Sequence, residues 1–205
     1  MKDNDPLYSC SDEELLRRFR LGQREVFGLL VKRYERELYG YLRRYIGDSH
    51  LADDVFQNTF LQVYLKCGQF EEGRPVRPWL YTIATNQAID AMRRTGRQQM
   101  VSLDQTNGVD AEGESRSMLD LLEGRTAGPL DESQDEERRL QVRHWVDQLP
   151  EFLRQVVLLA YYQGLKYRDV AEILGIPVGT VKSRLHTALL KLQELVAALP
   201  TLPEL

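Results

Sequence analysis

The sequence predicts an all-α protein of two small helical domains joined by an acidic, flexible linker. Apolar residues recur every three or four positions over residues 11–98, and again from about residue 136, which is the spacing of one helix face. Serine, glycine and acidic residues dominate residues 99–135, where little apolar surface is available for burial. No segment is a strong strand candidate. These observations predict domains at 11–98 and 136–200, with 99–135 as the linker.

The N-terminal domain is predicted to be helical almost throughout. Ser11 and Glu14 have the spacing of a capping box, so the first helix is expected to start there. Later apolar runs at helical spacing are interrupted at residues 47–49, where Gly-Asp-Ser breaks the pattern. Two glycines and two prolines predict a loop over residues 68–78, followed by a helix from about Trp79 to Arg94.

The C-terminal domain contains the most informative segment, residues 165–192, with the sequence LKYRDVAEILGIPVGTVKSRLHTALLKL. Its apolar spacing predicts two short helices, and Gly175 suits the left-handed position that ends the first. This arrangement is typical of a helix-turn-helix, whose second helix fits the DNA major groove. An ordinary helical hairpin would have the same periodicity, but it does not explain why the second helix carries these polar and basic residues outward: Lys182, Ser183, Arg184, His186 and Thr187.

Composition excludes several classes of protein. No apolar run approaches the length of a membrane span, and the first residues lack the apolar centre of a signal peptide, so we expect a cytoplasmic protein without membrane insertion. Cys10 and Cys67 fit neither a disulfide framework nor a zinc-binding pattern, so no metal and no cofactor are expected.

The net charge of −4 conceals a segregated pattern. Residues 1–98 carry 16 basic and 14 acidic side chains, and residues 138–205 carry 9 basic and 6 acidic ones. Residues 99–137 carry 2 basic and 11 acidic side chains, so the acidity belongs to the middle of the chain. Both predicted domains are therefore compatible with DNA, which responds to local potential.

Residues 74–97 form a second candidate nucleic-acid segment, with five arginines and one acid. Phosphates attract positive charge and unstacked bases stack on aromatic faces, so this mixture favours single-stranded or melting DNA. In the alternative, Trp79 and its apolar neighbours form core and the arginines are a solvated face. The candidate residues are Arg77, Trp79, Asn86, Asp90, Arg93 and Arg94.

Asp54, Gln57 and Phe60 predict a protein-binding helix face, at positions i, i+3 and i+6. The neighbouring Asp53 diverges from Asp54 by about 100° on a helix, which argues against a paired-carboxylate catalyst. A solvated acidic face remains the alternative for Asp53. The sequence contains no catalytic triad, phosphate-binding loop or dinucleotide motif, so no enzyme is expected.

Three segments, in this order and at these separations, resemble extracytoplasmic-function (ECF) sigma factors, the compact initiation subunits of bacterial RNA polymerase. They are VFGLLVKRYERELYGYLRRYIGDSHLADDVFQNTFLQVY, WLYTIATNQAIDAMRR and LPEFLRQVVLLAYYQGLKYRDVAEILGIPVGTVKSRLH. The resemblance covers residues 11–198. It implies a factor that binds core RNA polymerase and directs promoter-specific initiation. Its implied partners are the polymerase β′ clamp helices and β flap, promoter DNA and an anti-sigma factor.

The resemblance also implies residue roles. The face of Asp54, Gln57 and Phe60 corresponds to the contact with the β′ clamp helices. The loop before Trp79, with Asn86 and Asp90, corresponds to the site that melts the −10 element. The −35 element is implied to contact Lys182, Ser183, His186 and Thr187, and the acidic linker is implied to thread toward the polymerase active centre.

The sequence departs from the family after His186, where Thr187, Leu189 and Leu190 occupy positions at which basic residues are usual. Fewer cations make fewer contacts with phosphates, so we expect weak binding to the −35 element. The apolar run at 188–190 is expected to lie inside the domain or against a partner. Two other interpretations stay open: a regulator that binds DNA without replacing a polymerase subunit, and a helical adaptor that does not touch DNA.

Overall fold

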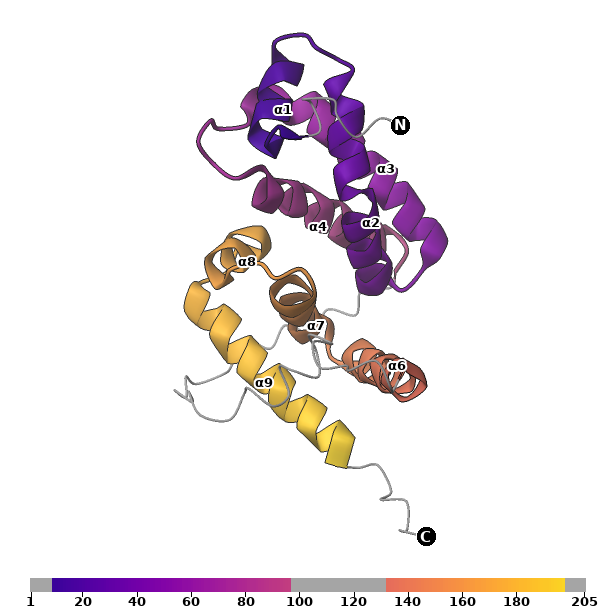
Figure 1. The fold of residues 1–205 in the computed structure, drawn as a ribbon. Helices are drawn as coiled ribbons and strands as arrows, with labels where there is room; N and C mark the ends of the chain where they lie inside the picture. The colour runs from indigo at the N-terminus through magenta and orange to yellow at the C-terminus, as the bar shows by residue number, and fades with distance from the viewer. Residues whose placement is uncertain (1–8, 97–131, 198–205) are drawn as a thin grey trace. The chain divides into compact units, whose positions relative to one another are not determined.

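The structure is a computed structural model that describes residues 9–96 and 132–197 (Figure 1). These residues form helices without any strand, which confirms the predicted all-α class. The chain divides into two compact units, one built from the N-terminal helices and one from the C-terminal helices. The predicted acidic linker lies outside the described residues, apart from its last four positions.

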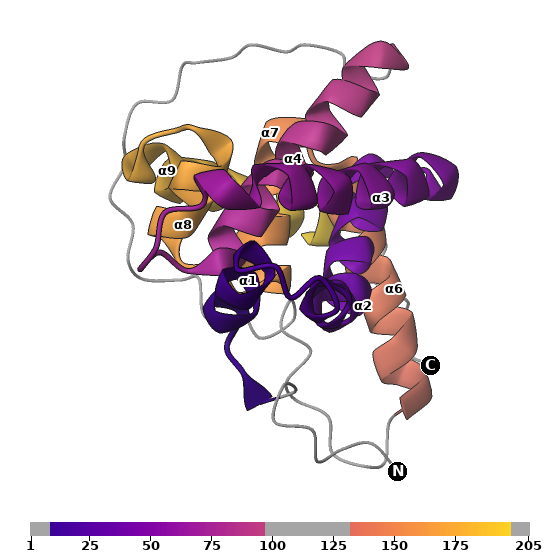
Figure 2. The same ribbon diagram turned by 90° about the horizontal axis from the view of Figure 1, so that it is seen from above.

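In the N-terminal unit the helices are α1 (Asp12–Arg20), α2 (Val26–Ile46), α3 (Ser49–Lys66) and α4 (Val76–Arg94), with a short 3-10 turn at Cys67–Gln69. Helix α2 lies against α1, α3 and α4 (Figures 1 and 2). Leu38, Tyr41, Leu42 and Tyr45 recur along its inner face and are all 0% exposed. The hydroxyls of Tyr41 and Thr85 share a buried hydrogen bond of 2.9 Å, which joins α2 to α4.

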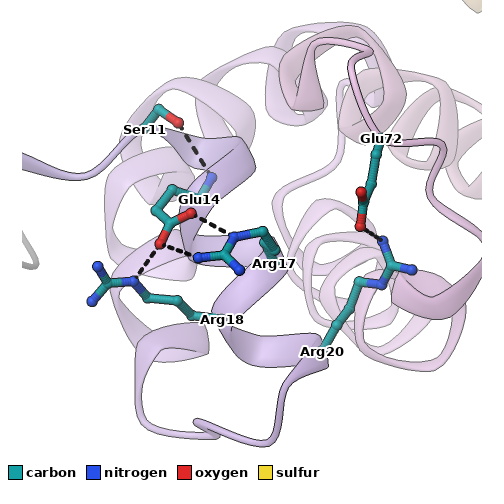
Figure 3. Close-up of polar contacts among 6 residues, drawn as sticks. All are labelled: Ser11, Glu14, Arg17, Arg18, Arg20 and Glu72. Atoms are coloured by element: carbon teal, nitrogen blue, oxygen red, sulfur yellow. Dashed lines mark hydrogen bonds and ion pairs between the residues drawn. The ribbon is translucent and has the colours of Figure 1, made fainter.

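Helix α1 begins as the sequence predicts. The Ser11 hydroxyl accepts a hydrogen bond of 3.2 Å from the Glu14 backbone N–H, which caps the helix (Figure 3). The Glu14 carboxylate accepts from Nε of Arg17 at 2.7 Å and from Nε of Arg18 at 2.6 Å. These two hydrogen bonds lower the pKa of Glu14 from its ordinary value of 4.5 to about 2.

The interruption at residues 47–49 is also confirmed. Gly47 has a φ of 76°, the left-handed conformation that ends a helix at low cost for glycine. The Asp48 side chain then accepts from the Leu51 backbone N–H at 3.0 Å and caps α3.

Helix α4 starts three residues earlier than the sequence predicts, at Val76 rather than about Trp79. Proline is tolerated in a first helical turn because those N–H groups have no partner within the helix, so Pro78 does not delay the start. The Val76 N–H, one of these orphan groups, donates to the Glu13 carboxylate on α1 at 3.0 Å. A tertiary contact therefore fixes the start of α4.

The C-terminal unit contains α6 (Glu132–Gln148), α7 (Glu151–Val157), a π-helical turn (Leu158–Tyr162), α8 (Tyr167–Leu174) and α9 (Val178–Ala197). Helix α6 begins within the segment predicted to be linker, a difference of four residues. Residues 132–139 are Glu, Gln and Arg-rich, and these side chains have high helix propensity even without an apolar stripe. Leu153, Val156 and Leu159 are buried in the core of this unit.

The lowered pKa of Glu14 predicts that the stability of the fold depends on pH. Because its folded pKa is depressed, the ionised carboxylate stabilises α1 at neutral pH, and this contribution disappears as the pH falls from 4.5 toward 2. We expect Glu14→Gln to lower the thermal midpoint at pH 7 and to match the native chain near pH 2, in melts followed by circular dichroism. Glu35→Gln, at an exposed position on α2, is the control. If the thermal midpoint of Glu14→Gln were as far below that of the native chain at pH 2 as at pH 7, the stabilising role of the ionised Glu14 carboxylate would be contradicted.

Candidate nucleic-acid interface

Helices α8 and α9 and the turn between them form the predicted helix-turn-helix. Gly175, with a φ of 63°, takes the left-handed position, and the Ile176 N–H donates to the Ala171 carbonyl at 3.0 Å. Helix α9 buries the predicted stripe of Val181, Leu185, Ala188 and Leu192. The predicted polar residues lie outside this stripe.

The polar side of α9 carries one exposed predicted residue, Lys182, beside partly exposed Ser183, His186 and Thr187. The Ser183 hydroxyl donates to the Thr180 carbonyl at 3.1 Å, and the Thr187 hydroxyl donates to the Ser183 carbonyl at 3.0 Å. Each hydroxyl proton is thereby used within the helix, while the oxygen lone pairs can still accept. Both hydroxyls are accordingly oriented as acceptors for donors such as base amino groups.

The Arg184 side chain packs against a neighbouring helix of its own unit. Its guanidinium carbon is 5.5 Å from the centre of the Phe152 ring on α7, and the side chain is half-buried. A cation over an aromatic face is a packing contact that stabilises the unit. Arg184, predicted to bind DNA, therefore already has a packing partner on the neighbouring helix.

The apolar run after His186 divides between core and surface. Ala188 and Leu189 are buried, whereas Leu190 is 47% exposed. The expectation that these residues lie inside the domain is thus confirmed for the first two. Leu190 occupies the exposed side of α9.

Helix α4 presents a polar face formed by Asn86, Asp90 and Arg93, all exposed and spaced by four and three residues. Arg94 is exposed on the adjoining side. The opposite side of the helix is buried at Ala84 and Ala88, and the neighbouring Thr85 bonds to Tyr41 in the core. The core of the unit therefore determines which way this polar face points.

Arg77 and Trp79 lie at the start of α4 and are only partly exposed. Nε and Nη2 of Arg77 donate to the Glu37 carboxylate at 3.2 and 3.4 Å. Burial opposes the charge of Arg77, but the hydrogen bond and negative charge of Glu37 outweigh it and raise the pKa of Arg77. This guanidinium, predicted to bind DNA, therefore already has a partner within the unit.

The Trp79 ring lies 5.0 Å, centre to centre, from the Phe70 ring, with 59° between the planes. Trp79 therefore packs against Phe70 and is partly exposed.

The predicted protein-binding face on α3 needs one correction. Asp54 and Gln57 are exposed, but Phe60 is 6% exposed and packs against Phe27 and Phe56. Phe60 therefore supports the face from beneath.

Sequence analysis missed Leu61 and Leu65, which are 53% and 63% exposed on the same side of α3 as Asp54 and Gln57. In the adjacent pair Phe60-Leu61, periodicity alone does not distinguish the apolar residue that faces the core from the one that faces solvent. The signal that would have found them is their seven- and eleven-residue spacing from Asp54.

Two other properties concern the described part of the chain. Residues 9–96 and 132–197 contain no group of three or more histidine, cysteine, aspartate or glutamate side chains that could hold a metal ion. None of the described helices combines the length and apolar character required to cross a membrane.

Comparisons with known proteins assign each of the two units to a protein family. The family described as Sigma-70 region 2 matches residues 30–98, and the family described as Sigma-70, region 4 matches residues 139–192. The RNA polymerase sigma-H factor of Pseudomonas aeruginosa is 33% identical over 178 residues, which cover 86% of this chain and 89% of the relative. The ECF RNA polymerase sigma-E factor of Escherichia coli K12 is 32% identical, covering 87% and 90%. This chain belongs to the ECF sigma factor family.

Other sigma factors agree with this assignment. The ECF sigma factor SigW of Bacillus subtilis is 30% identical over 174 residues, which cover 83% of this chain and 89% of SigW. Two solved structures share the fold: CnrH in complex with the cytosolic domain of CnrY, and RpoE of Bartonella quintana in complex with the anti-sigma factor NepR. Their TM-scores are 0.64 and 0.59 at 23% and 24% identity, and they cover 92% and 84% of this chain and 99% and 97% of theirs.

The two sigma regions contain the candidate residues described above. The region 2 match includes the exposed faces of α3 and α4, and the region 4 match includes the helix-turn-helix. The relatives are named as sigma factors, which are initiation factors of transcription.

The position of Arg184 in this ECF sigma factor can be tested through stability. We expect Arg184→Ala to lower the free energy of unfolding by about 1 kcal/mol, because the contact with Phe152 and the packing of its stem are lost. Lys182→Ala, at an exposed position on the same helix, is the control, and its effect should stay within about 0.5 kcal/mol. Urea unfolding followed by Trp145 fluorescence in a Trp79→Phe background reports on the C-terminal unit alone. Equal effects of the two substitutions would refute the packing role.

Proposed function

We propose that this protein is the promoter-recognition subunit of a bacterial RNA polymerase: it binds the core enzyme and directs initiation at a defined set of promoters. The observation that supports this most directly is the presence of sigma regions 2 and 4 on one chain, in the order found in sigma factors. The cellular location that follows from this role is the cytoplasm.

The N-terminal unit is proposed to hold the core enzyme through α3. Asp54 and Gln57 offer hydrogen-bonding groups, and Leu61 and Leu65 add exposed apolar area on the same side. Polar groups around an apolar centre are characteristic of protein interfaces. We assign this face to the β′ clamp helices, with Phe60 supporting it from the core.

The exposed face of α4 is proposed to melt and hold the −10 element. Asn86 can bond base edges, while Arg93 and Arg94 supply charge for phosphates. The accessible part of Trp79 is available for stacking of an unpaired base. Asp90 completes this face as an acceptor for base amino groups.

The C-terminal unit is proposed to bind the −35 element as duplex through Lys182, Ser183, His186 and Thr187, and to contact the polymerase β flap. An anti-sigma partner is also proposed, since the related fold of RpoE from Bartonella quintana was solved bound to the anti-sigma factor NepR. The acidic linker at 99–135 is proposed to run toward the active centre, where nucleic-acid channels are basic.

Transcript mapping tests the proposed function. The protein is mixed with sigma-free bacterial core polymerase and genomic DNA fragments, and the 5′ ends of the transcripts are sequenced. We expect discrete starts that share upstream elements. Binding to polymerase without such starts would favour a helical adaptor, and binding to DNA without polymerase would favour a separate regulator.

Two double variants separate the two roles of the N-terminal unit in the same assay. Asp54→Ala with Gln57→Ala should weaken capture of core polymerase at least tenfold, because two exposed polar groups of the α3 face are lost. Asn86→Ala with Asp90→Ala should retain capture but lose discrete starts. Glu35→Ala, on α2, is the control. Loss of polymerase capture by the Asn86 and Asp90 variant would contradict the division of roles.

A substitution at Thr187 tests the expectation that the chain binds the −35 element weakly. We expect Thr187→Arg to strengthen promoter binding and to steepen its salt dependence by about one unit of log K against log salt, because one phosphate contact is added. Thr187→Gln, which adds length without charge, is the control. The prediction fails if affinities for the identified promoter are unchanged by Thr187→Arg across the salt titration.

A further inference from the structure

The α3–α4 loop, residues 70–75, leads from the 3-10 turn after α3 to the start of α4. Residues 71–75 are exposed, whereas Phe70 is 7% exposed and lies against Trp79. This loop precedes the polar face of α4 that is proposed to hold the −10 element. A loop binds a ligand more tightly when its bound conformation is already fixed, because less ordering is needed on binding. The contacts that fix the α3–α4 loop in the free chain therefore bear on −10 binding.

Helix α1 contacts both ends of this loop. From the last residue of α1, Nη1 of Arg20 donates to the Glu72 carboxylate at 3.2 Å (Figure 3). The same nitrogen donates to the Phe70 carbonyl at 3.4 Å. In the first turn of α1, the Glu13 carboxylate accepts from the Val76 N–H at 3.0 Å. Because seven residues are about two helical turns, Glu13 and Arg20 lie on one face of α1, and the loop runs along that face.

We propose that Glu13 and Arg20 are positioning residues for the −10 element: they hold the α3–α4 loop in the conformation that receives an unpaired base. This inference rests on the proposed function of the N-terminal unit. It assigns neither residue a contact with DNA. Glu13 acts through the start of α4, and Arg20 acts through the Phe70 backbone, whose ring packs on Trp79.

The chemistry of Glu13 suits a contact at the start of a helix. The first N–H groups of α4 have no partner within the helix, and the positive end of the helix dipole favours a nearby carboxylate. Burial tends to raise the pKa of Glu13, but the hydrogen bond from Val76 and further hydrogen bonds and charges together outweigh burial and lower the pKa. The carboxylate is therefore ionised at neutral pH and accepts the Val76 N–H in that form.

Arg20 restrains the loop mainly through its main chain. The side chains of Arg20 and Glu72 are 29% and 72% exposed, so their ion pair alone is a weak contact. The hydrogen bond to the Phe70 carbonyl adds a partner whose side chain is fixed in the core. This second bond holds the backbone of the loop whatever conformation the Glu72 side chain adopts.

Acrylamide quenching of Trp79 fluorescence tests the position of the loop in the free chain. Trp145→Phe removes the other tryptophan, so that Trp79 alone reports. In this background we expect Arg20→Met, which keeps an apolar stem without a donor, to raise the quenching constant, because Phe70 loses a restraint. Arg17→Met is the matched control, since Arg17 pairs with Glu14 within α1 (Figure 3). An unchanged quenching constant in Arg20→Met would overturn the proposal.

Binding of single-stranded DNA tests the role of the loop in recognition. The native chain or a variant is assembled with core polymerase and titrated with a fluorescent single strand that carries a −10 element identified by transcript mapping. We expect Arg20→Met to weaken binding about fivefold, the typical effect of losing one hydrogen bond. Glu13→Ala should weaken binding similarly, whereas Glu13→Gln should keep the native affinity, because its amide oxygen can still accept the Val76 N–H.

Capture of core polymerase separates positioning from a general loss of structure. It should be the same for the native chain and all of these variants, because none of them alters the exposed face of α3. A parallel loss of capture would overturn the proposal, as would equal losses of strand binding in Arg20→Met and Arg17→Met. Failure of Glu13→Gln to keep what Glu13→Ala loses would also overturn it.

The outcome is distinguishable from that of the proposed function. Discrete transcript starts from the native chain, together with unchanged binding of the −10 strand by Arg20→Met, would reject the positioning role and leave the initiation function intact. Absence of starts from the native chain would reject the initiation function, and with it any role of the loop at a −10 element. The acrylamide measurement needs neither polymerase nor DNA, so it reports on the loop in both cases.

Discussion

The buried face of α2 is the constraint on which the N-terminal unit depends. Tyr41 and its neighbours on this face are fully buried, and α1, α3 and α4 all lie against the helix. The hydrogen bond between Tyr41 and Thr85 fixes the rotation of α4 about its own axis. Ala84 and Ala88 are buried whereas Asn86 and Asp90 are exposed, so this packing sets which side of α4 faces solvent. The geometry of the candidate −10 face thus follows from the packing of a tyrosine-rich core.

The same division between packing and recognition recurs in the C-terminal unit. Helix α9 uses its apolar stripe, and also Arg184, to attach itself to the rest of the unit, and only part of its polar surface remains for DNA. A cation that contacts an aromatic ring gains attraction without complete desolvation. One of the five polar residues expected on the recognition surface therefore contributes to stability.

Family membership and structure answer different questions about this ECF sigma factor. The family matches identify which segments of the chain correspond to Sigma-70 regions 2 and 4. They do not distinguish a side chain at an interface from one that supports it. Phe60 and Leu61 are adjacent within one matched region, yet the first lies in the core and the second is exposed. That distinction follows from the rotation of α3 against its neighbours.

The sequence by itself determined the all-α class, the two helical units and the breaks at Gly47 and Gly175, because these depend on local periodicity and on backbone conformations that favour glycine. The tertiary structure decided what local patterns leave open. Helix α4 starts at Val76 because a carboxylate from α1 accepts its first N–H. Arg77 and Arg184 contact Glu37 and Phe152 because folding brings distant charges and rings together. A single sequence records which side chains can bind DNA, but only the folded chain determines which of them already have a partner.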